Sequence, residues 1–279
     1  MSATTSPNAE KTPASVLVVA PQFPAINQPW IDTYLEQLLK NGYGLSICSS
    51  RDDVGEYSPK VDKLKLRDRV VLRHFEAEDF RRATIKALVS RPLRVLANMA
   101  GILSVAKALK SAGLSAKAAG FKAIAFLASD FELPKVDIIH CHGEFEAYEV
   151  LHFALANNIP LITTFHGLQP PGMPQLALDK RAALYRYCKA VLVNTRFAQD
   201  QVISLGCPPE KVRIIPQGLP MVDFPFYARA KPKDKLRILA VGRLQRDKGH
   251  AYTLGALRRL RQQGLPAELT IVGVGSAKQ

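Results

Sequence analysis

The sequence predicts an α/β fold built on a parallel, doubly wound sheet. Two observations support this class. Short apolar segments alternate with helical patterns from Val16 onward. Within these segments, apolar and polar residues do not alternate, so we expect each one to be a strand buried on both faces. Buried strands that alternate with helices are typical of parallel sheets.

The first part of the chain contains seven such segments. They cover residues 16–20, 45–48, 70–73, 136–141, 161–165, 191–194 and 212–215. Two of the helices between them have clear ends. Pro29 suits the first turn of a helix over 29–41, which Asn41 and Gly42 end. Thr195 is a good N-cap for a helix over 196–205, which Gly206 ends.

A basic helical insert over residues 79–132 interrupts this alternation. From Arg81 to Phe126 it carries nine Lys or Arg residues, no Asp or Glu, and many apolar residues. Basic amphipathic helices often lie on anionic membranes, so we expect contact with a membrane surface. The alternative is a helical pair that packs on the sheet and shows its lysines to water. Nucleic acid is not expected as a partner, because no aromatic residues interleave with the cations.

Proline and charge mark the domain boundaries. Residues 1–15 are polar and rich in turn formers, which predicts a disordered tail. A first domain is expected over 16–223, followed by a linker over 224–235 and the start of a second domain over 236–279. The last region holds only a strand, a helix and another strand. Because so few elements cannot cover their own sheet, we expect this second domain to be incomplete.

The composition indicates which kind of partner and which cell compartment to expect. Hydrophobic residues make up 47% of the chain, enough for a large core, and the net charge of +14 favours an anionic partner. The four cysteines are scattered without C-x-x-C spacing, which indicates reduced thiols and a cytoplasmic protein. The best candidate for a membrane span, the 12 uncharged residues 95–106, is too short to cross a bilayer. A peripheral location at the inner face of the cell membrane is therefore expected.

The segment over 238–250 combines a predicted buried strand, a glycine turn, two cations and the start of a helix. Gly242 opens the turn, Arg243 and Lys248 flank it, and Gly249 precedes the helix. Backbone N–H groups at a helix N-terminus and fixed cations together bind anions. The spacing predicts a diphosphate site whose cations stabilise charge on a leaving phosphate. The alternative is a pair of surface cations in an ordinary loop.

Histidines follow two predicted strands at the point where open α/β sheets bind ligands. His166 comes directly after 161–165, and Gly167 beside it would let a ligand approach the backbone. His140 and His142 are alternate residues at the end of another strand. Two histidines at this spacing suggest a metal, but no third ligand is recognisable near them. We therefore expect this strand end to line a cleft, with no metal.

These segments resemble, in order, motifs of retaining GT-B glycosyltransferases of the family 4 type, similar to those that build colanic acid and exopolysaccharides. V-G-R-x-x-x-x-K-G, here Val241 to Gly249, resembles their donor loop, and T-F-H-G, here Thr164 to Gly167, resembles the motif of their acceptor-domain histidine. Similar segments stand at residues 139–142, 193–197 and 206–218. The resemblance runs from about Val16 to Gly275.

The resemblance implies two Rossmann-like domains, an acceptor-side domain over 16–223 and a donor-binding domain from 236 onward. It implies that a sugar moves from a UDP- or GDP-sugar to a saccharide or lipid-linked acceptor with retention, without a metal or cofactor. The catalytic residues would be His166, Arg243 and Lys248, with His166 orienting the sugar. The donor would be bound by Gly242, Arg243, Lys248 and Gly249. The acceptor cleft would include Phe23, Asn27, His142, Gly167 and Asn194.

The chain also departs from the family pattern. Relatives often carry S-E-T-F where this chain has residues 27–30, which leaves the acceptor open. The base and ribose pockets that normally follow the I-V-G-x-G turn, here residues 271–275, are not in this sequence. We therefore expect a truncated enzyme. The alternatives are an inactive membrane-surface or partner-binding module and a nucleotide-sugar epimerase of similar architecture.

Overall fold

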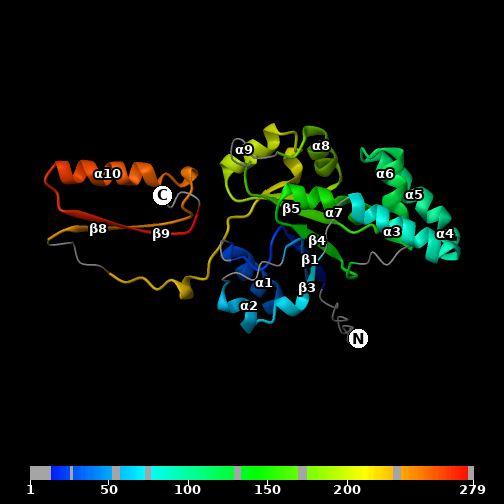
Figure 1. Ribbon diagram of the computed structural model, residues 1–279, viewed down its shortest axis with the longest axis horizontal. Coiled ribbons are helices and arrows are strands. Elements are labelled where there is room, and N and C mark those ends of the chain that lie inside the picture. Colours follow the sequence, from blue (N-terminus) through cyan, green and yellow to red (C-terminus); the bar gives the residue numbers. More distant parts are fainter. Residues whose placement is uncertain are drawn as a thin grey trace, which may run out of the picture. The chain divides into compact units, whose positions relative to one another are not determined.

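The computed structural model describes residues 14–25, 28–51, 57–72, 77–128, 133–168, 175–228 and 234–275. They divide into two compact units (Figure 1). Described residues up to Pro220 belong to the first unit and those from Met221 onward to the second. Of the residues with predicted roles, Asn27 lies outside the described residues, as do most of the tail and part of the predicted linker.

The first unit is built on a seven-stranded parallel sheet with the strand order β3-β2-β1-β4-β5-β6-β7. The strands are β1 (Ser15–Ala20), β2 (Gly44–Ser49), β3 (Val70–Leu72), β4 (Ile138–Cys141), β5 (Leu161–Phe165), β6 (Ala190–Val193) and β7 (Val212–Ile214). Each begins within two residues of the position that the sequence predicts. The predicted parallel α/β class is confirmed.

Helices cover both faces of this sheet, which is why its strands carry no alternating pattern. On one face, Val16 and Val18 of β1 pack with Ile31 of α1. On the other face, Leu17 and Val19 of β1 belong to a larger core that includes α7. The first face carries α1 (Pro29–Lys40) and α2 (Pro59–Lys63), and the second carries α7 (Glu144–Ala156), α8 (Leu178–Tyr187) and α9 (Arg196–Ser204).

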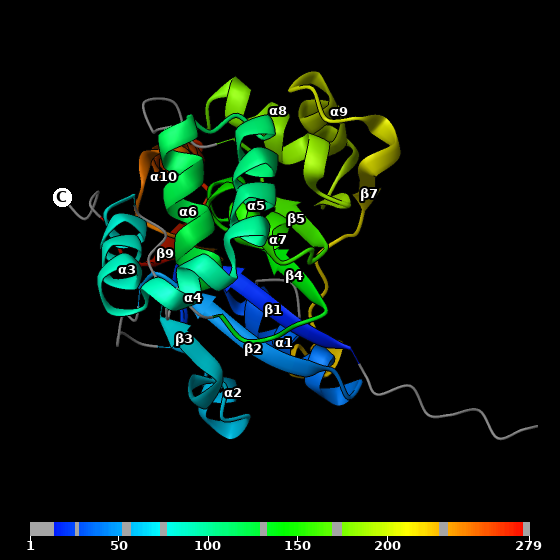
Figure 2. The same cartoon turned by 90° about the vertical axis from the view of Figure 1, so that its right-hand side faces the viewer.

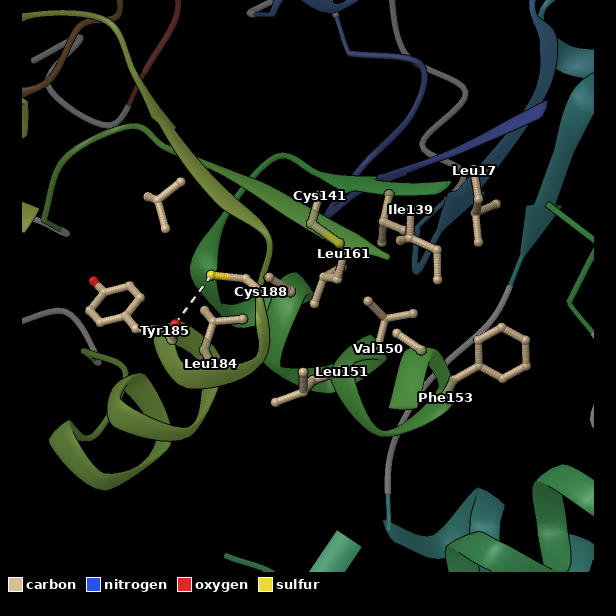
Figure 3. Packing of buried hydrophobic residues seen from close by; sticks show 14 of the residues in the cluster. Leu17, Ile139, Cys141, Val150, Leu151, Phe153, Leu161, Leu184, Tyr185 and Cys188 are labelled. Atoms are coloured by element: carbon tan, nitrogen blue, oxygen red, sulfur yellow. Dashed lines mark hydrogen bonds between the residues drawn. The ribbon is translucent and has the colours of Figure 1, made fainter. Parts of the chain in front are cut away.

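The α7 side holds the larger core. Figure 3 shows Val150, Leu151 and Phe153 of α7 close to Ile139 of β4 and Leu17 of β1. All five of these side chains are at most 5% exposed. Helix α9 begins as predicted, since the Thr195 hydroxyl accepts the N–H of Ala198 at 3.1 Å. Short 3₁₀ helices at η1 (Arg67–Arg69) and η2 (Pro209–Lys211) precede β3 and β7.

The basic insert forms a bundle of four helices. These are α3 (Ala77–Ser90), α4 (Pro92–Ala97), α5 (Met99–Ser111) and α6 (Ala116–Ala128). Helices α5 and α6 contact α7, so the bundle stands on the α7 side of the sheet (Figure 2). Ala87, Val95, Ile102 and Ala123 form a small core inside it. No helix among the described residues is both long and apolar enough to cross a membrane.

The second unit holds a two-stranded parallel sheet and one long helix. Its elements are η3 (Met221–Asp223), β8 (Leu236–Val241), η4 (Arg246–Lys248), α10 (His250–Gln262) and β9 (Ala267–Val272). Helix α10 packs on β9. Residues 238–241 form a strand, as predicted, but the prediction that this strand is buried is wrong, because Leu239 is 64% and Val241 72% exposed. Among the described residues of this unit, one helix covers one face of a narrow sheet.

Candidate functional site

A pocket of about 490 Å³ lies in the first unit, on the α1 face of the sheet. Strands β4, β5 and β6 contribute their residues that face α1. The first two turns of α1 and the segment 215–220 complete the lining. The main residues are Trp30, Tyr34, His140, His142, Ile162, Thr164, His166, Leu192 and Asn194. His142, His166 and Asn194 each follow a strand directly, so the carboxyl edge of the sheet carries the polar part of the pocket.

His140 links α1 to the sheet. Its Nδ1 lies 2.7 Å from the Tyr34 hydroxyl and its Nε2 lies 2.8 Å from Oγ1 of Thr164. Burial, with a smaller effect of nearby His166, lowers its pKa to about 4, so the ring is neutral near pH 7. Both nitrogens are already hydrogen-bonded. His140 is therefore a structural support for the pocket rather than half of a two-histidine metal site.

His142 is the buried polar side chain of this pocket that remains unsatisfied. It is 7% exposed, and neither ring nitrogen has a hydrogen-bond partner among the described residues. Burial, together with His140 and His166, lowers its pKa well below the usual value, so the ring is neutral. A neutral imidazole has one donor and one acceptor. Because buried polar groups are nearly always paired, an unpaired ring beside a pocket indicates a site for a polar ligand.

Aromatic rings surround His142 at the carboxyl edge. The Trp30 ring lies 5.2 Å from His142 and 4.5 Å from His166, between ring centroids. The rings of His142 and His166 are nearly parallel, at 20° and 5.8 Å. The His166 side chain is exposed at this edge. Gly167 follows it with φ of 102°, a conformation that favours glycine.

Of the other two described residues that were predicted to line the cleft, the structure places one in the pocket and one in the core. Asn194 lines the pocket, as expected. Phe23 does not: it is 1% exposed and packs with Ile31 and Ile47 in the core beneath α1. Burying an aromatic ring there removes a large apolar area from water, which accounts for the difference.

Sequence reasoning missed Trp30 and Tyr34 as pocket residues. Both were visible in the sequence, the first as a departure from the family pattern and the second as an apolar helix position. They are four residues apart, which places both on one face of α1. That spacing is the signal by which they are recognisable. The segment 215–220 is irregular, so no periodic spacing marked it as part of the pocket, although residues 206–218 resemble a family segment.

The predicted diphosphate loop lies in the second unit and is held by β9 and the residues after it. The N–H of Gly242 donates to the carbonyl of Val272 at 3.0 Å, and the N–H of Leu244 to that of Val274 at 2.8 Å. A side chain at Gly273 would collide with the carbonyl oxygen of Gly242. This close backbone approach explains why the I-V-G-x-G turn needs glycine there.

The loop presents two cations beside the start of α10. Arg243 and Lys248 are 47% and 43% exposed, and both approach Asp247, at 4.0 and 3.3 Å. Gly249 adopts the left-handed conformation just before α10, and the His250 ring lies 3.0 Å from the carbonyl oxygen of Arg243. The structure thus brings together the four predicted donor residues of this loop. It adds Asp247, a carboxylate whose position sequence spacing did not reveal.

Comparison with known proteins identifies a family. The chain matches the model of Glycosyltransferase Family 4 over residues 33–221. The amylovoran biosynthesis glycosyltransferase AmsK of Erwinia amylovora is 34% identical over 116 residues, which are 41% of this chain and 28% of that protein. A putative colanic acid biosynthesis glycosyltransferase, WcaL of Salmonella typhimurium, is 28% identical over 117 residues, 41% of this chain and 29% of that protein. The aligned part thus spans under a third of either relative.

Solved structures share the fold. HepE of Anabaena, in complex with UDP and glucose, superposes with a TM-score of 0.58 at 14% identity, over 94% of this chain and 62% of that one. Sucrose-phosphate synthase of Thermosynechococcus elongatus gives 0.53 at 16% identity, over 95% and 64%. These neighbours confirm the predicted GT-B type of fold.

Proposed function

We propose, from the premise that this chain belongs to glycosyltransferase family 4, that its protein transfers a sugar from a nucleotide-diphosphate sugar to a saccharide or lipid-linked acceptor. The relatives named for amylovoran and colanic acid support a role in making exopolysaccharide or another cell-surface glycan. One observation carries the proposal most directly. In a chain of this family, two exposed cations stand beside a helix N-terminus in the second unit.

The donor would bind through its diphosphate. HepE was solved with UDP and with UDP-glucose, which supports a UDP-sugar here, with a GDP-sugar as the other choice. As the bond from the sugar to the phosphate oxygen breaks, negative charge grows on that phosphate. Arg243 and Lys248 would stabilise this charge and release Asp247, and the N–H groups at the start of α10 would add to the effect.

The reaction would proceed with retention on one face of the sugar and without a metal. The acceptor oxygen would form its bond to the anomeric carbon on the face that the leaving phosphate vacates. The acceptor hydroxyl proton would pass to that phosphate, so the leaving group serves as the base. The two loop cations would supply the positive charge that this mechanism needs.

The acceptor would bind in the pocket of the first unit. Trp30 offers an apolar ring face, and the neutral His142 ring offers one donor and one acceptor to sugar hydroxyls. His166, exposed at the carboxyl edge, would orient the reacting sugar. The polar ring nitrogens and the aromatic faces together suit a saccharide, which has both hydroxyls and apolar C–H faces.

Replacing Lys248 tests the donor site. We expect Lys248→Ala to lower kcat/KM about a hundredfold, since one charge that acts on the leaving group is lost. The side chain is 43% exposed, so folding should not change. The measurement is sugar transfer from a labelled UDP-sugar, with thermal unfolding recorded in parallel.

Arg246→Ala is the matched control. Arg246 is an exposed cation in the same short turn, outside the predicted donor set. Its replacement should leave transfer near the wild-type rate. Near wild-type turnover in Lys248→Ala would refute the donor site, and equal losses in both variants would show that only the overall charge of the loop matters.

We also propose that the protein works peripherally on an anionic membrane, where a lipid-linked acceptor would reside. A second candidate function follows from the same surface: a module that binds membrane or a partner without catalysing transfer. The exposed apolar and basic helices of the insert favour it. Vesicle binding by a protein that binds no nucleotide and transfers no sugar would select this second function.

A further inference from the structure

The outer end of the helical bundle carries an exposed ridge of apolar side chains. One continuous stretch, residues 85–103, presents it, from the end of α3 through α4 to the start of α5. Figure 1 shows α4 at the end of the bundle away from the sheet. We call this the apolar ridge, and it consists of Ile85 (49% exposed), Leu88 (46%), Val89 (78%), Leu93 (80%), Leu96 (64%), Met99 (39%) and Leu103 (63%).

The buried core of the bundle does not include these side chains. The bundle core takes other residues of the same helices, namely Ala87, Val95 and Ile102, which are 1%, 5% and 4% exposed. A surface helix normally turns polar residues outward. In α4 both the inward and the outward faces are apolar, and Leu93 and Leu96 point to solvent. An exposed apolar patch of this kind marks an interaction surface.

The helices that carry the ridge also carry exposed cations. Lys86, Arg94 and Lys107 are exposed on the same three helices, and no acidic residue occurs between Arg81 and Phe126. A partner must therefore be anionic and must also accept apolar side chains. A nucleic acid backbone would satisfy the cations and leave the leucines in water. An anionic lipid surface satisfies both requirements, because headgroups pair with cations and the acyl region takes apolar side chains.

We propose that the apolar ridge inserts into the interface of an anionic lipid bilayer, with Leu93 and Leu96 as its deepest side chains and Lys86, Arg94 and Lys107 at the level of the headgroups. The two leucines are the most exposed large aliphatic side chains of α4. Binding strength in such helices comes from buried apolar area and from attraction to anionic lipid. This insertion rests on the peripheral membrane role proposed above. It needs neither the pocket nor the loop of Arg243, so it is independent of sugar transfer.

Vesicle sedimentation tests the apolar part. The full chain should bind vesicles of phosphatidylglycerol and phosphatidylcholine, and the double variant Leu93→Ser/Leu96→Ser should bind about tenfold more weakly, because two inserted side chains are lost. Leu178→Ser is the matched control, since Leu178 is 68% exposed on α8, outside the bundle. It should bind as the wild type does. Equal binding by the double variant and the wild type would overturn the proposal.

A second measurement separates insertion from adsorption by charge alone. All four native cysteines are buried, so Leu96→Cys allows one exposed position to carry an environment-sensitive fluorophore. We expect its emission to shift to the blue on anionic vesicles, whereas the same label at Leu178→Cys should stay unchanged. Binding without a shift at residue 96 would show adsorption only and would contradict insertion.

A charge variant completes the test. Lys86→Gln/Arg94→Gln should weaken binding to anionic vesicles about thirtyfold, by the loss of roughly 1 kcal/mol for each of the two cations near the surface. It should not change binding to neutral phosphatidylcholine, whereas the leucine variant should weaken both. Transfer to a soluble acceptor should be unaffected in all ridge variants, and Lys248→Ala should bind vesicles normally. A failure of the proposed transfer reaction would thus leave this result unchanged.

Discussion

His142 shows how a single residue indicates a ligand. Its imidazole is buried beside the pocket, and both ring nitrogens lack partners among the described residues. Burying an unpaired polar group costs free energy, and a hydroxyl of a bound saccharide would offset that cost. The sequence predicted His142 as a cleft residue. It did not show that the ring nitrogens of neighbouring His140 are already occupied and those of His142 are not.

The acceptor role proposed for His142 predicts a selective kinetic effect. His142→Phe keeps a ring of similar shape and removes both polar atoms, so the KM for the acceptor should rise about tenfold, which is the loss of one hydrogen bond of ordinary strength. The KM for the donor should stay the same. Steady-state kinetics with each substrate varied in turn would measure both.

His152→Phe is the matched control for that variant. His152 is also buried, on α7, where its Nδ1 lies 2.8 Å from the Lys122 ammonium, and it does not line the pocket. Its replacement should leave the acceptor KM unchanged, whatever it costs in stability. A donor effect equal to the acceptor effect in His142→Phe would contradict the assignment of this pocket to the acceptor.

His140 predicts a pH dependence of stability. Its pKa is about 4 in the folded protein and 6.5 as the usual value. Between these two pH values the unfolded state binds more protons than the folded state. The free energy of unfolding therefore has its full value above pH 6.5 and falls as the pH drops toward 4. The shift corresponds to a contribution on the order of 3 kcal/mol for this one residue.

Urea denaturation at several pH values would measure this effect. Compared with the wild type, His140→Gln should show a shallower loss of unfolding free energy between pH 6.5 and 4, whatever its stability at pH 7. Parallel curves for the two proteins would show that His140 is not the group that resists protonation.

At the scale of elements, glycine in the turn after β9 governs the shape of the diphosphate loop. Gly273→Ala would push against the carbonyl of Gly242, so we expect a loss of about 1–3 kcal/mol in unfolding free energy, as for other overpacked sites. Donor affinity should fall with it. Thermal unfolding and UDP titration would measure the two effects.

Gly255→Ala gives the comparison for that turn. Gly255 lies within α10, and a Cβ there would meet nothing within 4 Å. Alanine at this position should be neutral or stabilising by up to about 1 kcal/mol, by helix propensity alone. If both glycine variants behaved alike, the close contact with Gly242 would have no role in the loop.

The elements themselves were largely predictable, for physical reasons. Strands such as β1 and β5 do not alternate apolar and polar residues, because both sheet faces are covered. Thr195 predicts the start of α9, because its hydroxyl caps the helix. The environment of a single side chain was less predictable. Phe23 sits in a loop, and only the packing beneath α1 shows that its ring belongs to the core.

At the scale of the whole molecule, the two units differ in how many hydrophobic residues they bury. The first has two extensive cores on either side of its sheet. In the second, Ala267 is the only one of the described hydrophobic residues that is buried. The apolar residues of β8 suggested a buried strand, and the sequence pattern could not reveal that the described part of its sheet has two strands. Whether the second domain is incomplete, as the sequence suggests, stays a prediction.

Asp247 has a consequence for a protein whose net charge is +14. Such a protein attracts every small anion in its surroundings. Asp247 lies near both Arg243 and Lys248 and serves as a counterion tethered to the chain. A chloride ion would gain little by replacing it, because one negative charge would be exchanged for another. In the proposed donor site a diphosphate would bring more charge than the carboxylate that it displaces, so the loop would discriminate by valence before it discriminates by shape.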